Sequence, residues 1–418
     1  MELEELQQTD VERPRQPPTS NRKQTFLILL GCSILQLPTW GLPMTFGIFQ
    51  DVYDNRLTLS GSKSATGVIG TTLNGVMYLS MPFLSTFLDS GRWARRRRQV
   101  AIAGVGICAA FGGAMIFSPT TLFIDEWFRD GNRATAYSVT LSSKNIVGTA
   151  CPFLTYSLLD RLGFRNAIRI WAGIVFFTGI LGIMIIPTKS TSIQHTRPRN
   201  IPWSFMKHKT FAIYAIGNIV FSSGYGLPQT YLSQYASNVL HLSGILSTVI
   251  LAMFNAPGII SCFMMGWLCD KSYVSATTNT QISTLGSALC VFLLWGLNSH
   301  EIPALLILFS IGFGFFSGPY SSAWGGWIKD MEREAADNNE AINTGMVYGL
   351  LNGARGIGYV VGGLSGVELL KVGAVESSRQ WAYGTKYGAV IVFTGLCSVL
   401  GGWSILWQGH GSKAARRL

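Results

Sequence analysis

The sequence is poor in charged residues and has no cysteine framework. Asp, Glu, Lys and Arg make up 13% of the 418 residues, about half of the share that a soluble globular protein carries. This shortage excludes an ordinary soluble enzyme and a disordered chain. The seven cysteines show neither metal-ligand spacing nor a disulfide pattern. A disulfide-rich secreted fold is therefore excluded, and we expect neither a metal ion nor a cofactor.

What the sequence has instead is long apolar runs. Apolar residues make up 48% of the chain, and a helix needs about 20 of them in succession to cross the hydrocarbon core. We identify eleven such segments, near 25–50, 65–88, 100–124, 137–160, 166–187, 210–235, 244–268, 281–298, 302–328, 343–370 and 387–408. The sequence therefore predicts an all-α, polytopic membrane protein embedded in a lipid bilayer.

The net charge of +11 indicates the orientation of the chain in the membrane rather than a nucleic-acid partner. Lys and Arg gather in the polar gaps between segments, and gaps rich in these residues face the cytoplasm. We therefore expect both termini to be cytoplasmic, and we expect the protein to lie in the plasma membrane. The predicted parts are a disordered cytoplasmic tail (1–23), an amino-terminal helical half (24–187), a basic cytoplasmic linker (188–209), a carboxy-terminal helical half (210–408) and a second cytoplasmic tail (409–418).

The number of segments conflicts with the loop charges. The gaps at Arg95–Arg98 and Arg129–Arg133 are both basic, yet only segment 100–124 lies between them. Two cytoplasmic termini also require an even number of crossings, and eleven is odd. Either one of these gaps is external, or one helix of a twelve-helix plan is missing or merged near 100–124.

A weak internal repeat divides the chain at the linker. Segments two and seven end in the same pattern, a small residue followed four positions later by Asp, with a cation soon after. A carboxylate at a helix junction can bind the N-terminus of a neighbouring helix and so hold one conformer. We therefore expect a conformational latch formed by Asp89, Arg92, Asp270 and Lys271. Two halves related by a parallel repeat are the plan of the major facilitator superfamily.

The chain resembles this superfamily, and four segments are similar to its fungal monocarboxylate-porter-like branch in particular. They are Thr39–Leu42 with Phe46–Gln50, Trp127-Phe128 with Arg133-Ala134 and Gly148, Gly163–Arg169, and Asn255-Ala256, which resemble the first, fifth, sixth and eighth helices. The resemblance covers roughly 25–410 and departs at 100–124, where one segment represents the third and fourth helices. It implies a transporter that works by alternating access between two helical halves.

Charged residues within apolar segments are costly and point to function. Three are present, Lys144, Arg169 and Arg355. The resemblance places Lys144 and Arg355 in the fifth and eleventh helices, which are repeat equivalents. Two such cations suit an organic anion, because Arg offers a bidentate fork and Lys a point charge. Their alternative roles are snorkelling or pairing within the bundle, and Arg169 is expected to snorkel or to pair with Asp160.

Polar and aromatic side chains complete the candidate substrate site. They are Trp40 and Asn74 in the amino-terminal half and Tyr225, Gln229, Asn255 and Asn352 in the carboxy-terminal half, with Tyr231 and Tyr320 as further candidates. Hydrogen bonding between helices is the alternative role for each of them.

Carboxylates are absent from the middle of the predicted spans. Proton relays in transporters usually use intramembrane Asp, Glu or His, and the family that the chain resembles is commonly proton-linked. If transport is coupled to protons, Asp51 at the end of the first segment is the expected carrier.

These observations predict a transporter for a small organic molecule, most simply an organic anion. The resemblance favours efflux of a fungal secondary metabolite. Uptake of monocarboxylates or related nutrients and a transport-inactive paralogue are the alternatives. An enzyme is not expected, because the five histidines lie in gaps or at segment edges, away from any nucleophile in the membrane. The sequence indicates neither the substrate nor the oligomeric state.

Overall fold

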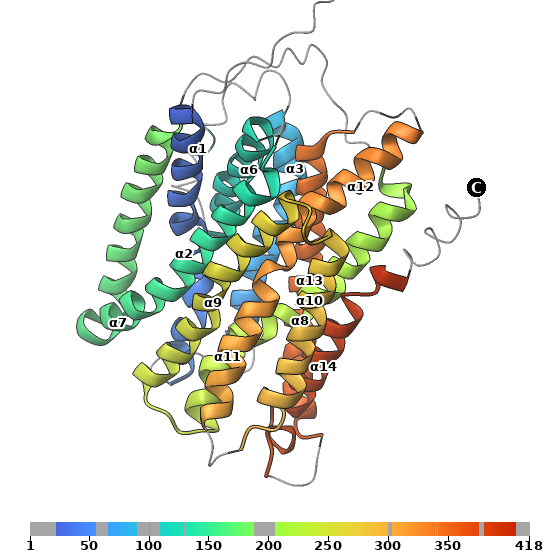
Figure 1. Cartoon of the computed structure of the whole chain (residues 1–418). Helices are drawn as coiled ribbons and strands as arrows, with labels where there is room; N and C mark the ends of the chain where they lie inside the picture. The colour runs from blue at the N-terminus through green and yellow to red at the C-terminus, as the bar shows by residue number, and fades with distance from the viewer. Residues whose placement is uncertain are drawn as a thin grey trace, which may run out of the picture.

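The computed structural model describes residues 22–55, 66–89, 100, 109–128, 131–187, 205–299, 303–338, 340, 342–375 and 380–406. Within these ranges the regular secondary structure is helical and contains no strand (Figure 1), which confirms the predicted all-α fold. Most of the two predicted tails and of the linker lies outside the described residues.

The amino-terminal half consists of α1 (Arg22–Ile34), α2 (Gln36–Asn55), α3 (Thr66–Asp89), α6 (Ala109–Trp127) and α7 (Arg133–Ile185). Helix α7 combines the predicted segments 137–160 and 166–187. It leaves helical geometry at Gly163, where φ is 73°, a value that glycine adopts at little cost. The chain bends sharply there, so one arm of α7 runs toward the middle of the bundle and the other rises beside α1 (Figure 1).

The carboxy-terminal half begins after the short turn η2 (Phe205–Lys207). Its elements are α8 (Lys209–Asn238), α9 (Gly244–Asp270), α10 (Ala276–Leu289) with the π-helical turn η3 (Cys290–Trp295), α11 (Pro303–Ser317) with the 3-10 turn η4 (Gly318–Ala323), α12 (Trp324–Asp337), α13 (Thr344–Val372), the turn η5 (Ala382–Gly384) and α14 (Gly388–Leu400). These elements match the six segments predicted after the linker.

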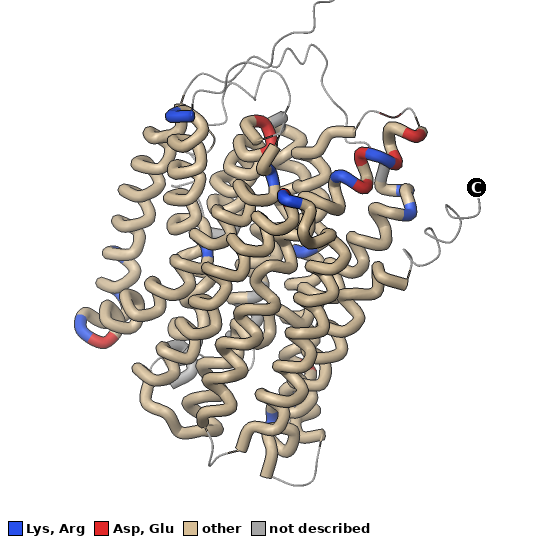
Figure 2. The backbone as a smooth tube through the Cα atoms, in the orientation of Figure 1, with Lys and Arg blue, Asp and Glu red and all other residues tan. Residues whose placement is uncertain are grey.

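Five helical stretches in the described residues are long and apolar enough to cross a membrane. They are Arg22–Phe49, Arg133–Ile185, Gly244–Asp270, Pro303–Asp337 and Gly388–Leu406. Charged residues lie mostly at the helix ends, whereas the middle of the bundle carries few of them (Figure 2). This distribution is the one that a hydrocarbon core requires.

The internal repeat identifies the position of α6. Pro119 and Trp127 in α6 have the same spacing as Pro319 and Trp327 in η4 and α12. Helix α6 packs against α3, as α11 packs against α9. Helix α6 is therefore the counterpart of the α11–α12 rod and takes the fourth position of its half-bundle.

The counterpart of α10 and η3 would fall between α3 and α6. Only 19 residues separate Asp89 from Ala109, against 32 between Asp270 and Pro303. That stretch is too short for a spanning helix of about 20 residues and its connections. In a twelve-helix plan, the predicted shortfall near 100–124 would therefore concern the third position. Of 90–108, only residue 100 is among the described residues.

The two halves meet where α3 crosses α13 and where α7 crosses α9. Glycines allow close backbone approach at both crossings, as small residues do between membrane helices. A Cβ added to Gly356 on α13 would lie 2.6 Å from the backbone nitrogen of Leu79. A Cβ added to Gly266 on α9 would lie 2.8 Å from the carbonyl oxygen of Ala134. The first contact lies near the middle of α3 and α13, whereas the second joins the end of α9 to the beginning of α7.

The substitution Gly356→Ala should destabilise the protein. The new methyl group meets backbone atoms of α3, and overpacking of this kind costs about 1–3 kcal/mol. Gly173→Ala is the matched control, because a Cβ at Gly173 meets nothing within 4 Å and alanine has the higher helix propensity. The midpoint of thermal unfolding in detergent should fall for Gly356→Ala and stay equal or rise for Gly173→Ala. The opposite order would contradict the tight crossing.

Candidate functional site

Two buried cations lie at equivalent positions in the two halves. Lys144 is the twelfth residue of α7, and Arg355 is the twelfth residue of α13. The exposed fraction of each is 4%. Each cation lies against an aromatic ring, with 4.2 Å between Lys144 Nζ and the ring centroid of Trp40, and 5.3 Å between Arg355 Cζ and that of Tyr225. Both pairs have cation–π geometry.

The two aromatic partners are also repeat equivalents. Trp40 opens the run Trp-Gly-Leu-Pro-Met-Thr in α2, and Tyr225 opens Tyr-Gly-Leu-Pro-Gln-Thr in α8. The amide of Gln229, in the second run, donates to Met44 Sδ, its equivalent in the first, at 3.1 Å. The structure thus brings together four predicted site residues as two matching cation–ring pairs. The repeated run was visible in the sequence and was not used there as a signal.

Two predicted asparagines repeat in the same way. Asn74 lies fifteen residues before Asp89, and Asn255 lies fifteen residues before Asp270. The amide of Asn255 crosses between the halves and donates to the carbonyl of Gly148 at 3.2 Å. The side-chain oxygens of Asn74 and Asn255 are buried without a hydrogen-bond partner in the described part of the chain. Both therefore keep a free acceptor.

The remaining predicted residues do not join the two cation–ring pairs in this conformation. Asn352 donates to the carbonyl of Tyr348, one turn earlier in α13, at 2.9 Å. Tyr320 stacks on Phe221 with 3.9 Å between ring centroids. Arg169 is exposed on the second arm of α7. Asp51 belongs to α2, but its side chain lies outside the described part.

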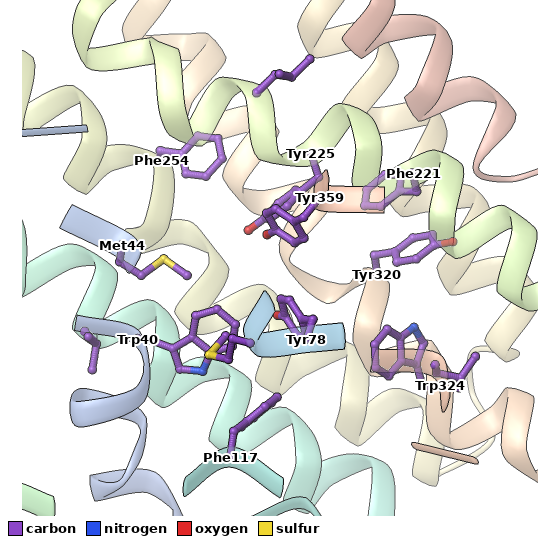
Figure 3. Packing of buried hydrophobic residues seen from close by; sticks show 14 of the residues in the cluster. Trp40, Met44, Tyr78, Phe117, Phe221, Tyr225, Phe254, Tyr320, Trp324 and Tyr359 are labelled. Carbon is purple, nitrogen blue, oxygen red and sulfur yellow. The ribbon is translucent and has the colours of Figure 1, made fainter. Parts of the chain in front are cut away.

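A central aromatic cluster connects the two cations (Figure 3). We define it as Trp40, Tyr78, Phe117, Tyr225, Trp324 and Tyr359, all of them buried. The ring of Tyr78 lies 5.3 Å from that of Trp40 and stacks on Tyr359 at 5.5 Å and 19°. Tyr359 in turn meets Tyr225 edge to face at 6.3 Å. An unbroken series of rings therefore runs from Lys144 to Arg355 across the boundary between the halves.

Sequence reasoning missed Tyr78 and Tyr359. A tyrosine inside an apolar helix is ordinarily a packing residue, and its spacing does not tell which neighbour it faces. The signal that could have found Tyr359 is its position one turn after Arg355, on the same face of α13.

The guanidinium of Arg355 has several aromatic neighbours and free donor capacity. Its Cζ lies 5.6 Å from the ring centroid of Tyr78 and 6.0 Å from that of Tyr359. Its Nη1 donates to Ser321 Oγ, whereas its buried Nε has no hydrogen-bond partner among the described residues. No carboxylate in the described ranges forms an ion pair with Arg355 or with Lys144. The centre of the bundle is thus cationic, aromatic and rich in donors.

Asp270, at the end of α9, binds the N-terminus of α7 in the other half. Its carboxylate accepts the backbone N–H of Ala134 at 3.2 Å and that of Thr135 at 2.6 Å, and the Thr135 hydroxyl at 2.6 Å. A helix N-terminus favours a negative charge. Lys271 is exposed. The side chain of Asp89 and the whole of Arg92 lie outside the described residues.

A second carboxylate, missed by the sequence prediction, bridges the halves at the same end. Asp125 at the end of α6 accepts the hydroxyl of Thr344, the first residue of α13, at 2.6 Å. It also lies 3.3 Å from Arg133 Nε, and Arg133 Nη1 lies 3.6 Å from Glu332 Oε1 on α12. The first turns of α7 and α13 are therefore both held by a carboxylate from the opposite half.

Removing the Asp270 carboxylate should loosen this end of the bundle. Asp270→Ala leaves two backbone donors without an acceptor, a loss of about 1–3 kcal/mol. The thiol of Cys262, now 1% exposed, should then react roughly tenfold faster with a membrane-impermeant maleimide added at this end. Labelling at Cys262 is measured by peptide mass spectrometry.

Asp330→Ala is the matched control, because Asp330 accepts the hydroxyl of Tyr214 at 2.9 Å within one half. Equal labelling rates in the Asp270 and Asp330 variants would show that Asp270 does not hold the halves together.

Comparison with known proteins agrees with this architecture. Residues 61–363 match the sequence profile of the Major Facilitator Superfamily. The chain is 24% identical to an MFS-type transporter of Gibberella moniliformis, over 76% of this chain and 79% of the relative. It is 23% identical to the Fujikurins efflux protein of Gibberella fujikuroi, over 53% and 46%. It is 24% identical to human Monocarboxylate transporter 11, over 41% and 37%.

Proposed function

Because the chain belongs to the major facilitator superfamily, we propose that this transporter carries a small organic anion by alternating access between its two halves. One observation carries the proposal. Lys144 and Arg355 are repeat-equivalent, buried and packed on aromatic rings, and no carboxylate in the described ranges pairs with them. A cation inside a membrane protein usually pairs with another group or binds a ligand.

An anionic substrate would supply the missing negative charge. Aromatic rings offset only part of the cost of burying a cation, and a carboxylate on Arg355 Nε would satisfy a donor that has no partner among the described residues. Lys144 belongs to one half and Arg355 to the other, so an anion between them attracts both halves. Binding would then favour the closed conformer over open ones.

The buried polar residues near the cations are the proposed remaining contacts. Asn74 and Asn255 hold free acceptors, which suit hydroxyl or protonated groups of the substrate. Gln229 lies at the boundary between the halves, where its amide contacts Met44, and it belongs to the repeated run that Tyr225 opens. Asn352 would take part after a change of rotamer, because its amide is bonded to its own helix.

We assign Asp270 and Asp125 the role of a latch that closes one end of the pathway. Each binds the first turn of a helix from the opposite half. Breaking both contacts would let the halves part at that end while the helix crossings act as pivots. The basic residues Arg22 and Lys23 begin α1 and support a cytoplasmic amino terminus. The plasma membrane is our proposed location.

We propose efflux of a fungal secondary metabolite as the direction and class. The resemblance to the Fujikurins efflux protein supports it. Uptake of a monocarboxylate is the second candidate, favoured by the similarity to Monocarboxylate transporter 11. A transport-inactive paralogue is the third, favoured by the short stretch between α3 and α6.

Neutralising Arg355 should abolish most of the flux. In proteoliposomes tested with a panel of radiolabelled aliphatic and aromatic carboxylates, Arg355→Gln should transport at least about tenfold more slowly than wild type, since a charge-assisted hydrogen bond contributes about 1.5–3 kcal/mol. Arg355→Lys should also be impaired, because lysine lacks the planar fork. Lys144→Gln should be impaired as well.

Arg169→Gln is the matched control, because Arg169 is a charged residue of the same bundle with an exposed side chain. Wild-type flux in Arg355→Gln, at equal protein incorporation, would contradict the proposed anion site. Vesicles of inside-out and right-side-out orientation separate export from uptake.

Proton coupling, if present, should depend on Asp51. An imposed pH gradient should then change the wild-type flux, and Asp51→Asn should remove that response while leaving exchange at equal pH. The measurement is initial flux against pH gradient for both proteins. A flux that does not respond to the gradient, or a response that survives in Asp51→Asn, would contradict this role.

A further inference from the structure

Tyr78 and Tyr359 form the point at which the aromatic series crosses between the halves. Tyr78 comes from α3 and Tyr359 from α13, and their rings stack with 5.5 Å between centroids and 19° between planes. Both side chains are almost fully buried. Figure 3 shows Tyr78 beside Trp40, with Tyr359 and Tyr225 overlapping above them. Two aromatic rings suited to stacking on a planar substrate therefore lie at the middle of the proposed pathway.

The same rings lie next to the cation that carries the proposed function. Arg355 Cζ is 5.6 Å from the ring centroid of Tyr78 and 6.0 Å from that of Tyr359. Its Nε is a buried donor without a partner in the described part of the chain. A molecule stacked on these rings would thus have an acidic substituent within reach of an unsatisfied charge.

We propose that Tyr78 and Tyr359 recognise a planar conjugated ring in the transported anion, while Arg355 holds its carboxylate. The substrate class is therefore aromatic or conjugated carboxylates rather than aliphatic monocarboxylates. This inference rests on the proposed function and narrows its substrate. The two tyrosines are specificity-determining residues, because they contact the ring and leave the charge to Arg355.

Ring geometry explains why planarity would matter. A saturated skeleton of the same size buries similar apolar area, but it gains no ring–ring attraction. Offset stacking favours the aromatic partner roughly threefold to tenfold for each ring pair. Trp40 meets Tyr78 at a tilt of 51° and Tyr225 meets Tyr359 edge to face, so two further rings flank the stacked pair.

A pair of probes with the same carbon skeleton tests the inference. 2-Naphthoate and trans-decahydro-2-naphthoate share ten ring carbons and one carboxylate, and they differ in planarity and conjugation. Dissociation constants for both are measured on purified full-length protein by isothermal titration calorimetry. Wild type should bind 2-naphthoate at least about fivefold more tightly.

Variants assign this preference to the two rings. Tyr78→Leu and Tyr359→Leu should bring the ratio of the two constants close to one, mainly by weakening 2-naphthoate. Tyr78→Phe and Tyr359→Phe keep a ring and should keep the ratio. Tyr387→Leu is the matched control, because Tyr387 is equally buried but packs on Tyr235 at 5.3 Å, outside the central cluster. Its ratio should equal that of wild type.

The possible outcomes separate this inference from the proposed function. Equal affinities for the two probes in wild type, or a ratio that survives in both leucine variants, overturn ring recognition. If Arg355→Gln still weakens both probes, the anion site then stands alone. If neither probe binds wild type, or if Arg355→Gln changes neither constant, the anion site is contradicted and ring recognition falls with it. Should the leucine variants fail to fold, the wild-type ratio and the phenylalanine variants decide.

Discussion

The cost of burying two positive charges inside a membrane bundle constrains the residues that surround them. Lys144 and Arg355 are almost completely buried, and such charges persist only where the surroundings compensate for lost water. Here the compensation within the described residues comes from ring faces and one hydroxyl, with no carboxylate partner. Packing, helix crossings and the close approach of the two halves all serve to assemble those rings. Within the described residues, no negative charge balances these two cations. An anionic substrate would supply that charge, whereas an apolar molecule would not.

The repeat explains why the site has two similar sides. Each half places an aromatic residue before Gly-Leu-Pro and a cation at the twelfth position of its long crossing helix. The duplication is imperfect in a way that matters for chemistry. One side offers a lysine on a tryptophan, and the other an arginine among several tyrosines. Arginine presents directional donors and lysine a point charge, so a substrate would be oriented as well as attracted.

Much of this was predictable, and the rest was missed for definite physical reasons. Apolar length predicted the helices, and the cost of intramembrane charge singled out Lys144 and Arg355. Tyr78 and Tyr359 were missed because their role depends on which helix each faces, and helical spacing alone does not fix a neighbour from the other half. Asp125 was missed because it ends an apolar segment, where a charge is ordinary. The repeated Gly-Leu-Pro run carried more information than single residues did, since it fixes which positions correspond.

The short stretch between α3 and α6 bears on whether this chain can transport. Its counterpart in the other half holds α10 and η3, which pack against α11, α14 and η4. None of the central aromatic cluster lies on α10, η3 or α14; its six residues come from α2, α3, α6, α8, α12 and α13. The central aromatic cluster therefore receives no residue from α10 or η3, the elements to which a third-position helix would correspond. What such a helix would add is lateral support for its own half, and its loss would affect how rigidly that half moves rather than what it binds. A transport-inactive paralogue that lacked such a helix would therefore be impaired in movement, since the central aromatic cluster would still assemble.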